Sequence, residues 1–218
     1  MKKIPTIYAR TADRRHVIVG QVTPGCEWVL SGEGVATRKY DGTCIMYDGH
    51  WWARREVKPG KAAPAGFVEV QHDDTTGKTV GWEPIEQSPF VKFWREAVKP
   101  LVLFGGLIDV GCRPIPGTYE LIGPKINGNP ERAETHRLES HDRAEVWDLG
   151  HDATPLDYMT ACRAGGVEGI VWHHPDGRMA KLKVRDIDWS PVRPLQSGPS
   201  RAVVEGVSTS PLPLEETP

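Results

Sequence analysis

Hydrophobic and polar residues alternate over short stretches of this chain, and Gly, Pro and Asp-Gly pairs separate these stretches. The alternation, rich in Val, Ile, Tyr and Trp, is typical of strands that bury one face and expose the other. The clearest examples are CIMYDGHWWARR, GFVEV, GTYELIG and EGIVWHHPDGRMAKLKV. Two pairs, Asp48-Gly49 and Asp176-Gly177, predict two-residue hairpin turns. The pattern therefore predicts sheets that are largely antiparallel.

Two longer stretches carry helix signals. SPFVKFWREAVKPLVL starts with Ser88 as a helix cap and Pro89 in the first turn, and Pro100 predicts the end of this helix. In TPLDYMTACRAGG, Thr154 is the predicted cap and Gly165-Gly166 the predicted end. We therefore expect an α+β domain whose largely antiparallel sheets are flanked by helices.

The length of 218 residues is that of one domain with a well-buried core. From about Ser190 the composition changes to Pro, Ser and small residues without periodicity, which is typical of a segment that does not fold alone. No internal repeat is visible. We predict a folded domain over residues 1–190 and a flexible Pro/Ser-rich tail over residues 191–218.

The formal net charge of −2 excludes a generally basic surface that holds nucleic acid by charge alone. A nucleic-acid partner would have to meet a local basic patch. Two clusters are candidates for such a patch, and each fits solvated surface charge equally well: Lys2, Lys3, Arg10, Arg14 and Arg15 near the start, and Arg54, Arg55, Lys58 and Lys61 farther on.

The sequence has no run approaching the roughly 18 apolar residues of a membrane span, and its N-terminus has basic residues without a continuous apolar core. These patterns predict a cytoplasmic protein without a membrane segment. The four cysteines, at positions 26, 44, 112 and 162, lack Cys-x-x-Cys spacing. We therefore expect buried or free thiols, and neither a zinc cage nor a secreted disulfide set.

One lysine stands in an unusual context. Lys39 lies two residues before an Asp-Gly pair, in a stretch, TRKYDGTCIMYDGHWWARREVKPG, that otherwise predicts a β-hairpin. A lysine of ordinary pKa, about 10.4, is a poor nucleophile at neutral pH, so catalysis requires surroundings that favour the neutral amine or accept its proton. A sheet core and neighbouring cations can provide such surroundings. By itself, the four-residue pattern KYDG is too common to establish catalysis.

Further charged residues occur on the strands that follow KYDG. Arg54 ends the next strand, Glu120 lies in TYELIG, and Glu168 precedes a glycine in EGIVW. In AKLKV, Lys181 and Lys183 share one face, because strand side chains alternate. Each residue alone also fits a structural role, as a strand-end charge or as part of the solvent face of an amphipathic strand.

In this order the motifs resemble those of the covalent nucleotidyltransferases, the superfamily of polynucleotide ligases and capping enzymes. That series consists of K-x-D-G, an arginine after the next strand, a strand glutamate, an E-G pair and K-x-K. Here KYDG, ARR, YEL, EGIV and KLK correspond to it, within residues 30–186. The chain looks most like the small stand-alone RNA ligases related to the vertebrate cytosolic RNA ligase. The resemblance implies a ligase-type adenylyltransferase domain.

The resemblance also implies a role for each residue. Lys39 would attack the α-phosphate of ATP and carry AMP as a lysyl-AMP intermediate. Lys181 and Lys183 would stabilise negative charge on the phosphate. Glu120 is implied at the ribose, and Glu168 at Mg²⁺, with Mn²⁺ as an alternative metal.

Two assignments within the family pattern stay open. Arg54 or Arg55 would hold a phosphate or the ribose edge, and we favour Arg54 because it directly continues the strand. The family stacks an aromatic residue on the adenine, but no Phe or Tyr occurs in the corresponding stretch HRLESHDRAEVW. His141 is the candidate there, with His136 and Trp147 behind it, although His141 equally fits a surface loop.

Other features have simpler explanations. His173-His174 lacks a third metal ligand at a suitable spacing, so these fit turn-edge histidines better than a metal site. The loop GPKINGNPE fits a plain connection, although Lys125 and Asn127 could reach a nucleotide or an RNA end. Four tryptophans are expected to pack the core rather than to stack on bases; they are Trp51, Trp52, Trp82 and Trp94.

About 35 residues follow KLK, too few for the oligonucleotide-binding β-barrel that DNA ligases and capping enzymes ordinarily carry. We therefore expect an ATP-dependent RNA ligase that joins RNA 5′-phosphate and 3′-hydroxyl ends in RNA repair. The alternatives are a minimal ATP-dependent DNA ligase, and a non-catalytic nucleotide- or RNA-binding module on a ligase fold. We expect a monomer with RNA and ATP as its partners.

Overall fold

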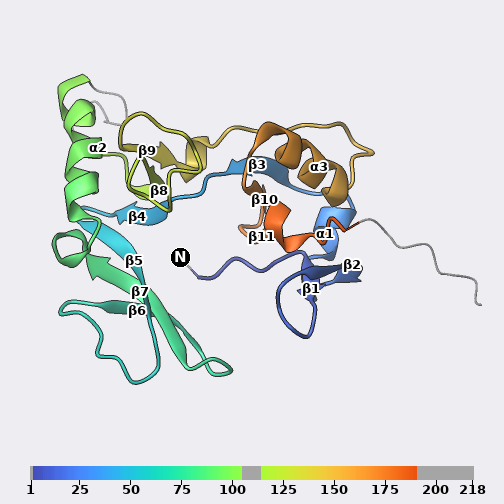
Figure 1. The fold of residues 1–218 in the computed structure, drawn as a ribbon, viewed down its shortest axis with the longest axis horizontal. Helices are drawn as coiled ribbons and strands as arrows, with labels where there is room; N and C mark the ends of the chain where they lie inside the picture. Colours follow the sequence, from blue (N-terminus) through green and yellow to red (C-terminus); the bar gives the residue numbers. More distant parts are fainter. Residues whose placement is uncertain (1, 105–113, 191–218) are drawn as a thin grey trace, which may run out of the picture. The chain divides into compact units, whose positions relative to one another are not determined.

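The computed structural model describes residues 2–104 and 114–190. The chain divides into two compact units, Met1–Asp188 and Trp189–Pro218, and the helices and strands described belong to the first (Figure 1). The predicted tail, residues 191–218, lies outside the described residues, as does Cys112. Among the described residues, no helix has the length and apolar character needed to cross a membrane.

The largest sheet among the described residues has six antiparallel strands (Figure 1). Its alternation follows the sequence pattern, because in one strand Ala53 is fully buried while Arg54 on the other face is half-buried. The strands stand in the order β6 (Val68–Asp73), β7 (Lys78–Pro84), β5 (Trp51–Val57), β4 (Thr43–Tyr47), β8 (Gly117–Ile122) and β9 (Arg137–Ser140).

A second, three-stranded antiparallel sheet has the order β11 (Met179–Lys183), β10 (Gly169–His173) and β3 (Val35–Lys39). A separate hairpin consists of β1 (Tyr8–Arg10) and β2 (Val17–Val22). The segment before β1 runs along β11, because Thr6 bridges Lys181 in parallel. The predicted class, α+β with largely antiparallel sheets, is confirmed.

The prediction that Lys39 lies within a hairpin is wrong. Lys39 is the last residue of β3 in the three-stranded sheet, whereas β4, the next strand, belongs to the six-stranded sheet. The Gly42 amide donates a hydrogen bond to the Glu120 carboxylate of β8 at 3.0 Å, which directs the chain into that second sheet. The KYDG segment is therefore the crossing between the two sheets.

Both Asp-Gly pairs lie in hairpin loops, but these loops are longer than the predicted two residues. β4 and β5 are joined by residues 48–50, and β10 and β11 by residues 174–178. In the first loop the Asp48 carboxylate accepts a hydrogen bond from the His50 amide at 3.2 Å. The side chain thereby closes a turn of its own, which adds a residue to the connection.

The core of the six-stranded sheet packs against α2 (Val91–Phe104). The Ser88 hydroxyl accepts a hydrogen bond from the Phe90 amide at 3.3 Å, but α2 begins only at Val91, so the predicted helix cap at Ser88 and the predicted first-turn position of Pro89 are wrong. The helix continues beyond Pro100, so its predicted end was wrong. A proline removes one backbone hydrogen bond from a helix, and the residues after it can keep helical geometry.

The three-stranded sheet packs against α3 (Pro155–Gly165) (Figure 1). This helix follows its sequence signals: Thr154 and Asp157 form a reciprocal capping box, and Gly166 ends it in the left-handed conformation, with φ of 66°. Tyr158 contacts Trp172 of β10, with ring centroids 5.5 Å apart. The shorter helices are α1 (Glu27–Leu30), η1 (Ile85–Gln87), η2 (His141–Arg143) and η3 (Val184–Asp186).

Most of the residues expected in the core are found there. Trp51 and Trp94 pack together with ring centroids 5.7 Å apart, and Trp82 is 5% exposed. Trp52 is half-buried, and its indole donates a hydrogen bond to Asp48 at 2.9 Å. The cysteines within the described residues are buried free thiols, as expected; they are Cys26, Cys44 and Cys162.

Candidate active site

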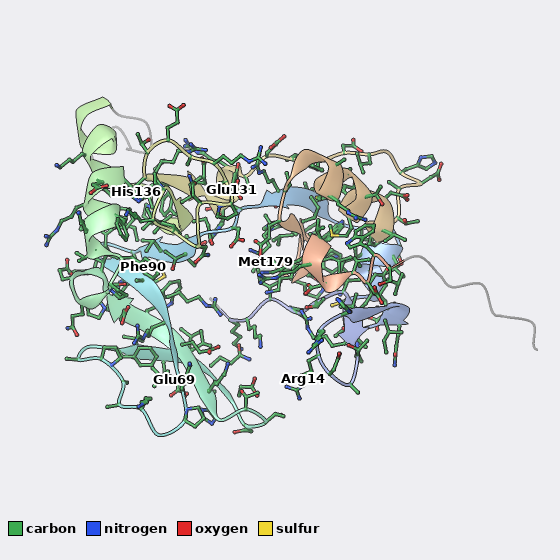
Figure 2. All side chains as sticks on the ribbon, viewed as in Figure 1. Arg14, Glu69, Phe90, Glu131, His136 and Met179 are labelled. Atoms are coloured by element: carbon green, nitrogen blue, oxygen red, sulfur yellow. The ribbon has the colours of Figure 1, made fainter. Side chains whose placement is uncertain are left out.

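A cavity of about 540 Å³, a usual size for a small-molecule site, lies between the two larger sheets. Met179, labelled in Figure 2, belongs to its three-stranded side, and Lys3 and Ile4 reach it from the segment before β1. The three-stranded sheet contributes Thr37, Lys39, Val171, His173, Met179 and Lys181. The six-stranded sheet contributes Cys44, Arg54, Glu56, Val80, Thr118 and Glu120.

The strand register brings two of the predicted lysines to opposite sides of one glycine. Gly169 of β10 pairs with Lys39 of β3 and with Lys183 of β11. Glu168, the residue before it, accepts a hydrogen bond from each lysine, with N–O distances of 2.5 Å. The three side chains are 19%, 14% and 7% exposed for Lys39, Lys183 and Glu168. Residues far apart in the sequence thus form one ionic cluster at the cavity.

Two glycines of the motifs permit the close approach of strands at this cluster. A Cβ on Gly169 would lie 2.2 Å from the carbonyl oxygen of Leu182, and a Cβ on Gly42 would lie 2.3 Å from that of Leu121. Because both obstructing atoms belong to the backbone, neither can turn away. A larger residue at either position would push apart the strands that carry the site residues.

The KYDG segment is held in place by the loop between β8 and β9. Glu131 of this loop (Figure 2) accepts hydrogen bonds from the Arg38 guanidinium at 2.6 Å and from the Asp41 amide at 2.9 Å. The side-chain amide of Asn127 donates to the Asp41 carboxylate at 3.1 Å and to the Gly42 carbonyl at 2.8 Å. The loop therefore positions the segment, which is more than the plain connection that its composition suggested.

The ionic cluster shifts the pKa values of its members. Burial opposes the charge on Lys39, but the carboxylates of Glu168, Glu120 and Asp41 outweigh it and raise the pKa of Lys39 above its ordinary value. Burial also opposes the charge on Glu168, but the ammonium groups of Lys39 and Lys183 outweigh it and lower the pKa of Glu168. The resting Lys39 is therefore charged at neutral pH, so of the two possibilities that the sequence left open its surroundings do not favour the neutral amine.

Lys181 lies in the opposite electrostatic situation, although it lines the same cavity. Burial, together with the charges of Lys183 and Lys39, lowers the pKa of Lys181 to about 8. The register places Lys181 opposite Val171, two residues along β11 from the lysine that binds Glu168. An anionic ligand in the cavity would favour the charged form of Lys181 and raise its pKa again.

The two consecutive arginines of β5 point to different faces of the sheet. Arg54 lines the cavity. Arg55 faces away from it, with its Nε 3.8 Å from a carboxylate oxygen of the buried Glu83. Strand alternation therefore assigns Arg54 to the cavity, as favoured from the sequence.

Glu120 and His141 form a hydrogen-bonded pair in the cavity wall. His141 Nε2 lies 3.1 Å from the Glu120 carboxylate, and because an ionised carboxylate can only accept, the histidine is the donor. His141 Nδ1 lies 2.9 Å from the Thr118 hydroxyl. The other Glu120 oxygen accepts from the Gly42 amide. Bonds at both ring nitrogens fix the orientation of the imidazole, so His141 is not a plain surface histidine.

The two residues ranked behind His141 lie elsewhere. His136 stacks on Phe93 of α2, with ring centroids 4.7 Å apart, and its Nδ1 is 2.7 Å from the Glu96 carboxylate (Figure 2). Trp147 is held beside β3, where its amide donates to the Ala36 carbonyl at 2.9 Å. Neither side chain belongs to the cavity lining.

Sequence reasoning missed part of the lining. Thr37, Thr118 and Met179 each lie two positions before a predicted site residue, so strand alternation was a sufficient signal for them. Lys3 and Ile4 had no such signal, because they reach the cavity through the tertiary pairing of their segment with β11.

Within residues 2–104 and 114–190, no three His, Cys, Asp or Glu side chains are grouped to hold a metal ion by themselves. His174 instead hydrogen-bonds to Glu33 at 2.9 Å, whereas His173 lines the cavity. Mg²⁺ needs no such cage, because it usually keeps several waters and binds one or two carboxylates together with substrate phosphates. The carboxylates of Glu168 and Glu120 are metal ligands of the type that Mg²⁺ binds.

No protein-family model matches this chain. It is 30% identical to RNA ligase 1 of Rattus norvegicus, with 68% of this chain and 65% of the rat protein covered. It is 27% identical to RNA ligase 1 of Danio rerio, with 67% of this chain and 65% of the fish protein covered. The chain thus spans less than two thirds of the length of these relatives. The similarity supports an RNA ligase family for the chain.

Proposed function

We propose that this protein is an ATP-dependent RNA ligase, built on a ligase-type adenylyltransferase domain, that joins RNA 5′-phosphate and 3′-hydroxyl ends. The observation that carries the proposal is the Lys39 amine, which lines the cavity within 2.5 Å of Glu168 and shares that carboxylate with Lys183. The similarity to proteins named RNA ligase 1 supports RNA as the substrate.

In the first step, the Lys39 nitrogen attacks the α-phosphorus of ATP. An N–P bond forms, the bond from this phosphorus to the oxygen that bridges to the β-phosphate breaks, and pyrophosphate leaves. Because Lys39 is charged at rest, its ammonium must first release a proton to solvent before the amine can attack. In the resting site Glu168 holds the ammonium at 2.5 Å through its Oε2.

The cations around the cavity would stabilise negative charge on the phosphate oxygens. Lys181 and Arg54 line it from opposite sheets, and Lys183 adds a third positive charge beside Lys39. The pKa of about 8 means that Lys181 is mostly charged at neutral pH and becomes more so beside a phosphate. Glu120, fixed by His141, would accept hydrogen bonds from ribose hydroxyls.

We assign a bound Mg²⁺, or Mn²⁺, to Glu168. When bound, such an ion would neutralise charge on the transferred phosphate. Both Glu168 oxygens bind lysines in the resting site, so a metal ion at this residue competes with the ammonium groups of Lys39 and Lys183.

Two further steps complete the proposed reaction. A 5′-phosphate oxygen of RNA attacks the phosphorus of lysyl-AMP, a phosphoanhydride forms, and the N–P bond breaks with its electron pair going to the Lys39 nitrogen, which takes a proton from solvent. The 3′-hydroxyl of a second RNA end then attacks the 5′-phosphorus, and a phosphodiester forms as AMP leaves with the electrons of the broken anhydride bond. The hydroxyl proton is released to solvent.

The pH dependence of the first step should reflect both lysines. With Lys39 charged and its pKa raised, the reactive fraction should grow about tenfold per pH unit below its pKa. Above about pH 8, Lys181 loses its charge in the free enzyme, so the rise in kcat/KM for labelling by ATP should flatten. Single-turnover labelling between about pH 6 and about pH 10 measures this profile.

Lys181→Arg is the matched variant, because an arginine stays charged over the whole range. Its profile should keep rising beyond the point at which the wild-type profile flattens. Superimposable profiles for the two proteins would show that Lys181 has no part in binding the nucleotide.

The proposed function is tested by a joining assay. With ATP and Mg²⁺, the protein should ligate a 5′-phosphorylated RNA to an RNA 3′-hydroxyl end, and the rate should fall at least about tenfold when the 3′-hydroxyl strand is DNA. The reason is that the 2′-hydroxyl is the group by which a local site distinguishes RNA from DNA. Both substrates can be compared on one denaturing gel.

The two alternative functions, a DNA ligase and a non-catalytic binding module, predict different results in these assays. A minimal DNA ligase would seal nicked DNA at least as fast as it joins RNA. A non-catalytic nucleotide- or RNA-binding module would neither join RNA nor become covalently labelled by radioactive ATP. Either outcome would reject the RNA-ligase proposal.

A further inference from the structure

The three-stranded side of the cavity changes from charged to uncharged along its strands. The row that contains Lys39 and Gly169 holds the ionic cluster. The next row contains Lys181 and Thr37, which both pair with Val171, and the row after it contains His173 between Val35 and Met179. At about 3.4 Å per residue, His173 lies about 14 Å along β10 from Gly169. A nucleotide with its phosphates at the lysines would therefore reach this uncharged end with its base.

His173 is oriented by the hydroxyl of a neighbouring strand. The Thr37 hydroxyl lies 3.2 Å from the Val171 carbonyl oxygen and 3.0 Å from His173 Nε2. A hydroxyl has one proton, and a carbonyl oxygen can only accept. Both contacts are satisfied together when Thr37 donates to Val171 and accepts from His173. This arrangement places the ring proton of His173 on Nε2.

The other ring nitrogen of His173 is then an acceptor. Burial and the neighbouring charge of His141 outweigh the opposing charge of Asp142 and lower the pKa of His173, so the ring is neutral at physiological pH and Nδ1 carries a lone pair. Among the described residues, none hydrogen-bonds to this nitrogen, and the residue lines the cavity. This end of the three-stranded sheet thus presents one oriented, uncharged hydrogen-bond acceptor to the cavity.

We propose that His173, held by Thr37, determines the base specificity of the site by accepting a hydrogen bond from the 6-amino group of adenine. Guanine has an oxygen at the same position, so two acceptors would face each other and the base would be rejected. The inference rests on the proposed function, which supplies the nucleotide, and it adds the residue that distinguishes ATP from GTP.

The other candidates near this end are less suited to the role. Both nitrogens of His141 are engaged with Glu120 and Thr118. Asp142 also lines the cavity and can accept a hydrogen bond, but it is exposed, so water can satisfy its carboxylate when no base is bound. His173 is half-buried, with its orientation fixed by Thr37.

The test is nucleotide binding without chemistry. Calorimetric titrations of the full chain would compare AMP, GMP and purine riboside 5′-monophosphate, which is AMP without its 6-amino group. None of the three has a pyrophosphate leaving group, so the affinities do not depend on lysine labelling. We expect AMP to bind about tenfold more tightly than either of the others, the usual effect of one hydrogen bond in a partly buried site.

Two variants assign the preference to the proposed pair of residues. His173→Gln has no group at the Nδ1 position, so the AMP preference over purine riboside monophosphate should fall to less than about twofold. Thr37→Val is isosteric but removes the hydroxyl that fixes the ring, so it should weaken the same preference while leaving β3 formed. A ratio of affinities measured on one preparation is insensitive to a fraction of unfolded protein.

Three outcomes would overturn the inference: a wild-type protein that prefers GMP, a His173→Gln variant that keeps the full AMP preference, or loss of that preference in Asp142→Asn and not in His173→Gln. Failure of the proposed function is separate, because it would appear as AMP discrimination without covalent labelling or RNA joining. Labelling and joining with an unchanged AMP preference in His173→Gln would instead reject the role of His173 alone.

Discussion

Lys39→Ala is expected to abolish the covalent transfer of AMP from radiolabelled ATP to the protein. The substitution removes the attacking nitrogen, and the remaining cations can stabilise charge but cannot form the same N–P bond. The fold should survive, because Glu168 keeps its 2.5 Å hydrogen bond from Lys183. Denaturing gels detect the label, and circular dichroism checks the fold.

Lys181 makes this experiment discriminating. With a pKa of about 8 it has a larger neutral fraction than Lys39 at any pH, so on charge alone it is the better nucleophile. If Lys39→Ala were fully labelled and Lys181→Ala were not labelled, the nucleophile would be Lys181 and not Lys39. Lys39→Arg keeps a cation beside Glu168 and should also remain unlabelled. Lys92→Ala, at an exposed lysine of α2, should label like the wild type.

Glu168→Gln is expected to reduce the labelling rate by about 100-fold or more, because it removes the carboxylate that orients Lys39 and that we assign to the metal ion. It should also lower the free energy of unfolding by about 3 kcal/mol, since two poorly exposed ammonium groups lose their shared counter-charge. Rapid-quench labelling and urea denaturation measure the two effects.

Removal of the Glu168 charge should have a third effect, on the pH profile. This effect distinguishes a role of Glu168 in the site from a general loss of structure. Without the Glu168 charge, which raises the pKa values of both Lys39 and Lys181, the pKa of Lys181 should fall further, so the labelling profile should flatten at a lower pH than in the wild type. Glu86→Gln, at an exposed position of η1, is the matched control and should change neither rate nor stability. An unchanged rate in Glu168→Gln would remove this carboxylate from the proposed mechanism.

Local patterns were sufficient for much of the secondary structure. The cap at Thr154 and the glycine at position 166 predicted α3, because both depend on neighbours within one or two turns. The same reasoning failed at Pro100, where a helix tolerates the loss of one hydrogen bond. It also failed around KYDG, where a run that reads as one hairpin is divided between two sheets by the contact of Gly42 with Glu120.

The sequence by itself determined which side chains can share a face, because strand alternation is a property of the backbone: it places Lys181 with Lys183, and Arg54 rather than Arg55, toward one side. The tertiary structure alone decided the charges at the site. Lys39 and Glu168 are 129 positions apart, yet their hydrogen bond holds Lys39 charged, while Lys181, two residues from Lys183, has its pKa lowered. Electrostatic interactions depend on distance and burial in space, and neither quantity can be read from the order of residues along a chain.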